Sequence, residues 1–510
     1  MLCIGTFLKH KNDKYKGTLN GLCEQMTQFP ALLGRVKSEL AGQILTTVLG
    51  AALILFLARL LGPEQYGLLF LVVSILTFAR IFSDAGVANS GARYITEYKE
   101  RDPGQIPHIL RISFGYNLVT IVLVVAVLVA GRHYFAGVFG EDELAVLLLY
   151  GSLFVIFGTI VRYVRVILQG FEKIGLSAIV HVLTVLSRFV FVIGLVVLGY
   201  GVWGAFAGYI ISFILVSILG LGLLYLRFYR RMNTNAPVEQ TLRKRIAEYT
   251  FPLTATNTAK ALDLHIDTIL VGFFLNPVSV GFYVLAKQIA QFLETPAYAV
   301  GFSLAPTFGT EKARNNVERS SQIYETSLIY SLFVYLPAAV GLILVAEPAI
   351  QYVFGMGYLG AVPVLHVLAL YVVFRAITTI TENSLDYLGR ARARAIIKLP
   401  TVGLNIVLNI LLIPRLGVVG AALATVVSYG LFSVATMYII STELNLRVQY
   451  LGRQMTSIIV ITGLMGIAVA FGVQFVSSLF GLVLLILAGM AIWAVSGIAF
   501  GILDVETLLN

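Results

Sequence analysis

Apolar stretches of about twenty residues follow one another along almost the whole chain. A helix of roughly twenty apolar residues is long enough to cross a hydrocarbon core about 30 Å thick. Only 12% of the 510 residues are charged, whereas soluble domains carry about 25%. The sequence therefore predicts an all-α, polytopic membrane protein. Its two cysteines, Cys3 and Cys23, offer neither a disulfide framework nor a thiolate metal site.

We count about fourteen such stretches. They cover residues 38–58, 66–88, 112–131, 143–165, 176–198, 202–226, 250–274, 280–305, 323–346, 360–383, 396–414, 417–441, 455–475 and 479–501. The Lys and Arg residues fit this count, because 28 of 36 fall in the amino-terminal part or in every second predicted loop. The positive-inside rule then predicts that both termini are cytosolic and that the protein lies in the plasma membrane. This topology accounts for the net charge of +10, so the charge does not indicate nucleic-acid binding.

A motif near residue 61 returns near residue 275. Residues 61–71 read Leu-Gly-Pro-Glu-Gln-Tyr-Gly-Leu-Leu-Phe-Leu, and residues 275–285 read Leu-Asn-Pro-Val-Ser-Val-Gly-Phe-Tyr-Val-Leu. The offset is 214 residues, and a second pair at residues 201–205 and 417–421 has an offset of 216. Two anchors at nearly the same offset indicate a duplicated unit of about two hundred residues, and transporters often contain such repeats.

Six spans in each copy is an even number, so both copies are expected to enter the membrane in the same direction. The fold is therefore predicted as two parallel six-helix repeats plus two extra carboxyl-terminal helices. A basic segment between the copies sets the topology and can attract anionic lipid headgroups. The predicted parts are residues 1–35 as a cytosolic tail, 36–226 as a first lobe, 227–249 as the basic linker, 250–441 as a second lobe and 452–503 as the last two spans.

Several segments resemble the polysaccharide-unit, or O-antigen, flippases (Wzx/RfbX-like), a family of the multidrug/oligosaccharidyl-lipid/polysaccharide superfamily. The similar segments are residues 58–68, Asp84-Ala85-Gly86 with Arg93-Tyr94, residues 267–272 and residues 281–286, within a resemblance that covers roughly residues 35–505. The resemblance implies a MATE-like, V-shaped fold with two lobes around a central cavity. It also implies that the chain moves a polyprenyl- or dolichyl-pyrophosphate-linked glycan from the inner to the outer leaflet by alternating access.

Five basic residues lie inside predicted spans: Arg80, Arg188, Lys260, Lys287 and Arg375. Each would cost about 2.5–3.5 kcal/mol at a helix centre, so all five are expected to face protein or water. Helical spacing places each one on a polar stripe of its own helix. The stripe partners are Asp84 for Arg80; Ser177, His181 and Thr184 for Arg188; Asp263 and Asp267 for Lys260; Gln291 and Glu294 for Lys287; and Thr379, Glu382 and Asp386 for Arg375.

These stripes lead to two hypotheses about binding. Arg80, Arg188, Lys287 and Arg375 are predicted to bind the pyrophosphate, because a guanidinium group donates two parallel hydrogen bonds to phosphate. Lys260, Asp263, Asp267, Glu294 and Glu382 are predicted to line the cavity and to bind a coupling ion. Two acids and one base on one stripe leave a net negative charge, which suits H⁺ or Na⁺. The alternative interpretation is structural, with Arg80–Asp84 and Lys260–Asp263 as local ion pairs.

Other functional classes remain as alternatives. A cation-coupled multidrug exporter of the same superfamily is the main one. A glycan polymerase or ligase would usually need a sizeable outer loop that carries catalytic groups, and no predicted loop provides one. The sequence contains no P-loop and no His/Cys ligand cluster. We therefore expect a monomeric transporter without enzymatic activity, without a metal or organic cofactor, and with lipid-linked glycan and membrane lipids as its partners.

Overall fold

The computed structural model describes residues 16–232, 236–294 and 317–502. Within these ranges the chain is helical and contains no strand. This agrees with the predicted class, because a helix satisfies its backbone hydrogen bonds internally when no water is present. Ten helical runs in the described residues are long and apolar enough to cross a membrane. Two of these runs, Leu45–Arg101 and Ile174–Arg231, each include two of the predicted spans almost entirely.

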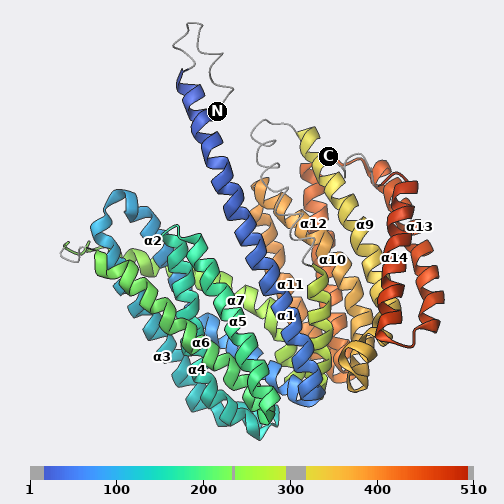
Figure 1. The fold of residues 1–510 in the computed structure, drawn as a ribbon, viewed down its shortest axis with the longest axis horizontal. Helices are drawn as coiled ribbons and strands as arrows, with labels where there is room; N and C mark the ends of the chain where they lie inside the picture. The colour runs from blue at the N-terminus through green and yellow to red at the C-terminus, as the bar shows by residue number, and fades with distance from the viewer. Residues whose placement is uncertain (1–15, 233–235, 295–316, 503–510) are drawn as a thin grey trace.

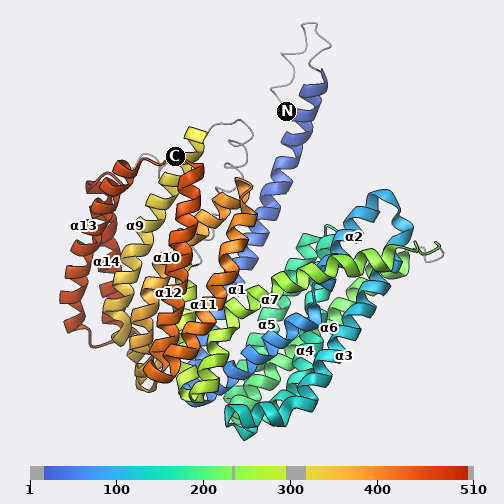
Figure 2. The ribbon, with the colours of Figure 1, turned by 180° about the vertical axis from the view of Figure 1, so that it is seen from behind.

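The helices form two groups that lean apart at the end where α1 begins and converge at the opposite end (Figures 1 and 2). The first group is α1 (Lys16–Asp84), α2 (Val87–Arg101), α3 (Ile106–Phe139), α4 (Asp142–Gly170), α5 (Ile174–Leu195) and α6 (Gly201–Arg227). The second group is the helix over residues 277–294 with α9 (Val317–Ala349), α10 (Val362–Tyr387), α11 (Ala391–Leu416), α12 (Val418–Glu443), α13 (Val448–Gly472) and α14 (Leu479–Ala499). We call these groups the first and the second lobe.

Helix α7 (Leu242–Phe274) joins the two lobes, since it packs against α1, α2 and α3 of the first and against α11 and α12 of the second. Its first turns are tied to α2. Ser90 donates a hydrogen bond to the carbonyl of Ile246, and Arg245 forms an ion pair with Glu97. The predicted linker over residues 227–249 therefore ends inside a helix, because α7 begins at Leu242.

Both copies of the repeated motif mark a break between two helices. In the first copy, Gly62 has φ 71° inside the long α1, a conformation that glycine adopts readily because it has no Cβ. Pro63 follows, and the helix resumes in a new direction, since proline cannot donate the backbone hydrogen bond that a continuous helix needs. In the second copy, α7 ends at Phe274 and the next helix begins at Pro277. The duplicated sequence therefore places the same turn in both halves.

Two predicted boundaries were wrong. The second predicted span runs to residue 88, but α1 ends at Asp84, because Ala85 and Gly86 have positive φ angles of 43° and 74°. The predicted loop at residues 162–173 is mostly helical, because α4 continues to Gly170. This second difference moves Arg162 and Arg165 from a loop onto a helix, and both belong to the site described below.

Candidate functional site

Arg80 and Arg188 lie together in the first lobe, held by aromatic rings. The guanidinium carbon of Arg80 lies 5.7 Å from the ring centres of Phe154 and Phe213. That of Arg188 lies 5.2 Å from Phe213 and 4.9 Å from Tyr209. Neither arginine forms a hydrogen bond or an ion pair with another described residue, and the Nε of Arg188 is buried without a partner. Cation–π contacts replace part of the lost hydration and leave the N–H groups free to donate.

The predicted pair between Arg80 and Asp84 does not form. Asp84 instead accepts a hydrogen bond from Nε of Arg162 at 2.8 Å and is buried, with 3% of its surface exposed. Arg165 lies one turn further along α4, and its Nε has no hydrogen-bond partner among the described residues. The first lobe therefore carries four arginines and one paired carboxylate at this level. The sequence did not reveal Arg162 and Arg165, because their position after an apolar stretch is also typical of a loop.

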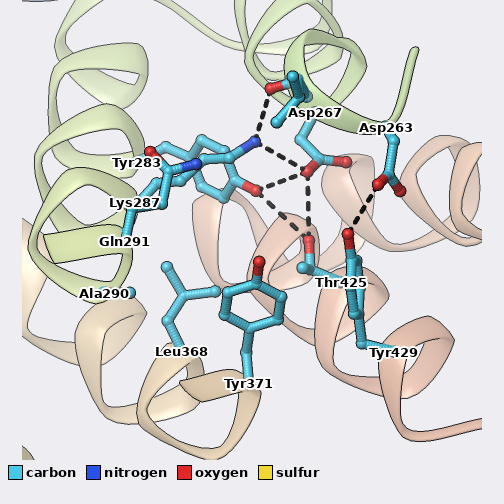
Figure 3. Close-up of a pocket in the computed structure, with 11 residues that line it drawn as sticks. Asp263, Asp267, Tyr283, Lys287, Ala290, Gln291, Leu368, Tyr371, Thr425 and Tyr429 are labelled. Carbon is cyan, nitrogen blue, oxygen red and sulfur yellow. Dashed lines mark hydrogen bonds and ion pairs between the residues drawn. The ribbon is translucent and has the colours of Figure 1, made fainter. Parts of the chain in front are cut away.

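Asp267 on α7 is the centre of a polar cluster that joins four helices (Figure 3). Its Oδ2 accepts hydrogen bonds from Tyr283 at 2.9 Å, Lys287 at 3.3 Å and Thr425 at 3.3 Å. Its Oδ1 accepts one from Asn409 at 2.8 Å. Only 2% of the residue is exposed, and a carboxylate so deeply buried is stable only when it is paired and hydrogen-bonded. The sequence predicted Asp267 and Lys287 as polar residues on neighbouring helices, but not their direct contact.

Asp263 lies one turn earlier on α7 and has partners of its own. Its Oδ2 accepts hydrogen bonds from Tyr429 at 2.7 Å and from Lys398 at 2.9 Å. A small cavity of about 20 Å³ lies between the two aspartates and is lined by Tyr283, Lys287 and Tyr429 among others (Figure 3). A cavity of this size holds one water molecule or a small cation. Carboxylate, amide and hydroxyl oxygens surround it, and hard cations prefer such ligands.

Arg375 is the centre of a second charged network in the second lobe. It donates to Glu294 at 3.2 Å and to Glu382 at 3.5 Å, and its side chain is 26% exposed. Arg394 lies 4.0 Å from Glu382 and 3.2 Å from Asp386. Arg375 therefore has ionic partners, unlike Arg80 and Arg188. Its own helix hides this in sequence, because Glu294 comes from a helix 81 residues away.

The four predicted phosphate ligands thus fall into two kinds, which face each other across α7. His265 of α7 lies within electrostatic reach of Arg80 on one side and Lys287 on the other. Arg80 and Arg188 have no acidic partner among the described residues, whereas Lys287 and Arg375 are already paired with carboxylates. The side chain of Lys260 lies outside the part of the chain that the structure describes. Within that part, no group of three or more His, Cys, Asp or Glu residues gathers as a metal site.

Comparison with known proteins identifies the class. A solved structure described as the lipid II flippase MurJ in an inward closed conformation superimposes with a TM-score of 0.75 at 18% identity, over 92% of this chain and 99% of that chain. An inward-facing multidrug MATE transporter gives a TM-score of 0.64 at 16% identity, over 80% of this chain and 96% of that chain. The fold is therefore that of the MOP superfamily, whose members include transporters and flippases.

Sequence comparison gives the family. The family model described as polysaccharide biosynthesis protein matches residues 35–310, and a MatE model matches residues 252–411. The probable low-salt glycan biosynthesis flippase Agl15 of Haloferax volcanii is 24% identical over 80% of this chain and 84% of its own length. The probable flippase AglR of the same organism is 25% identical over 78% and 80%. The chain belongs to the polysaccharide biosynthesis protein family, which confirms the resemblance seen in the sequence, and its relatives are transporters rather than enzymes.

Proposed function

We propose that this protein moves a lipid-pyrophosphate-linked oligosaccharide from the inner to the outer leaflet by alternating access. The observation that carries the proposal is the pair of arginines, Arg80 and Arg188, which are held by aromatic rings without an acidic partner among the described residues. A buried cation without a counter-ion is costly and is usually retained for a function. Pyrophosphate is the anion that this family's glycan carriers would bring, and the relatives named as glycan flippases support this choice.

The second part of the proposal is coupling to H⁺ or Na⁺ at Asp263 and Asp267. Lys287 and the coupling ion would compete for Asp267, because the lysine ammonium now lies where a cation would neutralise that carboxylate. An ion that replaces the ammonium would free Lys287, together with the charge it carries, to reach the pyrophosphate. This links ion binding to substrate binding through a single side chain, which is the differential interaction that a coupled transporter requires.

The proposed topology is fourteen spans, arranged as two parallel six-helix repeats and a final pair, with both termini in the cytosol of a plasma-membrane protein that acts as a monomer. The breaks after Gly62 and at Pro277 support the repeat. The helices α7 and 277–294 are not among the ten apolar runs. We count them as spans because their charged residues are paired within the second lobe.

A cation-coupled multidrug exporter is the second candidate, and the MatE match over residues 252–411 favours it. The unpaired arginines oppose it, because a cationic wall repels organic cations.

Reconstitution in vesicles tests the two candidates directly. The protein is incorporated into liposomes with a fluorescent polyprenyl-pyrophosphate glycan, and the fraction of probe that becomes accessible in the outer leaflet is measured with time. Flippase activity requires this fraction to rise faster than in protein-free vesicles and in vesicles with Arg80→Gln/Arg188→Gln protein. Export of a cationic dye without movement of the glycan probe would instead establish the multidrug exporter.

A further inference from the structure

The two copies of the repeated motif touch each other in the folded protein. Gly67 of the first copy lies so close to the second that a Cβ at this position would be 1.7 Å from the carbonyl oxygen of Pro277. The same Cβ would be 2.7 Å from the backbone nitrogen of Gly281. In return, a Cβ on Gly281 would be 2.3 Å from the carbonyl oxygen of Pro63. Each glycine therefore rests on the backbone that begins the other copy's helix, and the contact is reciprocal.

Real Cβ contacts with backbone atoms essentially never fall below 3.0 Å. Any residue other than glycine at these positions would push the two helices apart. Because the motif breaks each helix at the same point, the duplication brings the same two small residues to the same place from opposite lobes. The contact joins the first lobe, through α1, with the second, through the helix over residues 277–294, at the end where the lobes converge (Figure 1).

Polar bonds between the lobes surround this contact. Tyr66, which is fully buried, donates to Gln288 at 2.5 Å. Tyr358 donates to the carbonyl of Ala58 at 3.0 Å. Arg59 donates from Nε to the carbonyl of Val353 at 2.6 Å, and its side chain is otherwise exposed. Val353 ends a helix, and a cation is favoured at a helix carboxyl terminus.

We propose that this reciprocal glycine contact is the outer gate of the transporter and that the duplicated motif exists to build it. The proposal rests on the alternating-access function proposed above. The gate is closed in this structure. An outward-open state requires the lobes to part at this end, which separates Gly67 from Pro277 and breaks the bonds of Arg59, Tyr66 and Tyr358. Because glycine contributes no side chain, the two backbones meet as smooth surfaces that can separate without unlocking interdigitated side chains.

A methyl group at Gly67 is the sharpest test, because it fits only when the gate is open. The experiment uses protein with Cys3→Ser and Cys23→Ser and a single reporter, Gln291→Cys, which is partly exposed and lines the small cavity behind the gate. A membrane-impermeant maleimide labels this cysteine in intact cells and in inverted membranes. We expect Gly67→Ala to raise the ratio of outside to inside labelling about tenfold, equivalent to about 1.4 kcal/mol.

The matched control is Gly137→Ala, near the end of α3, where a Cβ would meet nothing within 4 Å. It should leave the ratio unchanged. Gly281→Ala should act like Gly67→Ala, since the contact is reciprocal. Unchanged labelling in folded Gly67→Ala and Gly281→Ala proteins would overturn the gate.

If the alanine variants do not accumulate in membranes, Arg59→Gln decides the question, because it removes bonds across the gate without adding bulk. A shift toward outside labelling supports the gate, and an unchanged ratio overturns it. The labelling needs no substrate. A shift in labelling without glycan movement in the vesicle assay would therefore keep the gate and refute the proposed flippase activity.

Discussion

Replacing Arg188 with methionine should stabilise the protein while it abolishes transport. An arginine at a helix centre costs about 2.5–3.5 kcal/mol on the insertion scale. Arg188 recovers part of this through its contacts with Tyr209 and Phe213, and cation–π contacts are worth about 0.5–2 kcal/mol. Methionine keeps the length and flexibility of the side chain without the charge. The free energy of unfolding should therefore rise by about 1–2 kcal/mol, the difference between these terms.

The same substitution at Arg375 should have the opposite sign. Arg375 neutralises Glu294 and Glu382, whose side chains are 20% and 19% exposed. Without it, two carboxylates remain largely buried beside each other, and breaking such a pair costs about 3–5 kcal/mol. Exposed Arg231 provides the control, since a surface arginine changes stability by less than about 0.5 kcal/mol when it is replaced.

The assay is thermal unfolding of the purified proteins in one detergent, followed by intrinsic fluorescence, beside glycan movement in vesicles. The expected order of midpoints is Arg188→Met above wild type and Arg231→Met, and Arg375→Met below both. Glycan movement should be lost in Arg188→Met and retained in Arg231→Met. A lower midpoint for Arg188→Met would refute the reasoning, because it would mean that Arg188 has a stabilising partner and is not a free cation waiting for an anion.

Three further outcomes follow from the contacts described above. Asp267→Asn should remove the dependence of glycan transport on pH and Na⁺ while some transport persists; full retention of that dependence would exclude Asp267 as the coupling site. Glu325→Gln should lower the free energy of unfolding by about 1.5–3 kcal/mol, because the buried carboxylate accepts three hydrogen bonds from Arg447; glycan movement per folded molecule should not change. The hydrogen bond from Tyr98 lowers the pKa of Glu239 below its ordinary value of 4.5. Its stabilisation is therefore present above pH 4.5 and is lost as the pH falls through the lower folded-state pKa, so the difference in amide exchange over residues 236–245 between wild type and Glu239→Gln should disappear on acidification.

Much of the fold could be predicted from the sequence. The apolar stretches predicted the helical membrane class, because their length alone satisfies the requirements of a bilayer. The motif at residues 61–71 and 275–285 predicted a turn in each half, and the structure breaks the helices at Gly62 and before Pro277. The boundaries near Asp84 and Arg162 could not be predicted, because hydropathy does not report where a backbone turns. Those two errors concealed two arginines of the site.

The sequence by itself determined which residues carry charge inside the membrane, and it placed each on a stripe of its own helix, because helical spacing is a local property. Only the tertiary structure decided which of these charges are neutralised. Asp84 pairs with Arg162, Asp267 with Lys287, and Arg375 with Glu294, and each pair joins different helices. An ion pair depends on distance in space, and the distance between two helices is set by packing, so the free arginines could be identified only after the paired ones had been found.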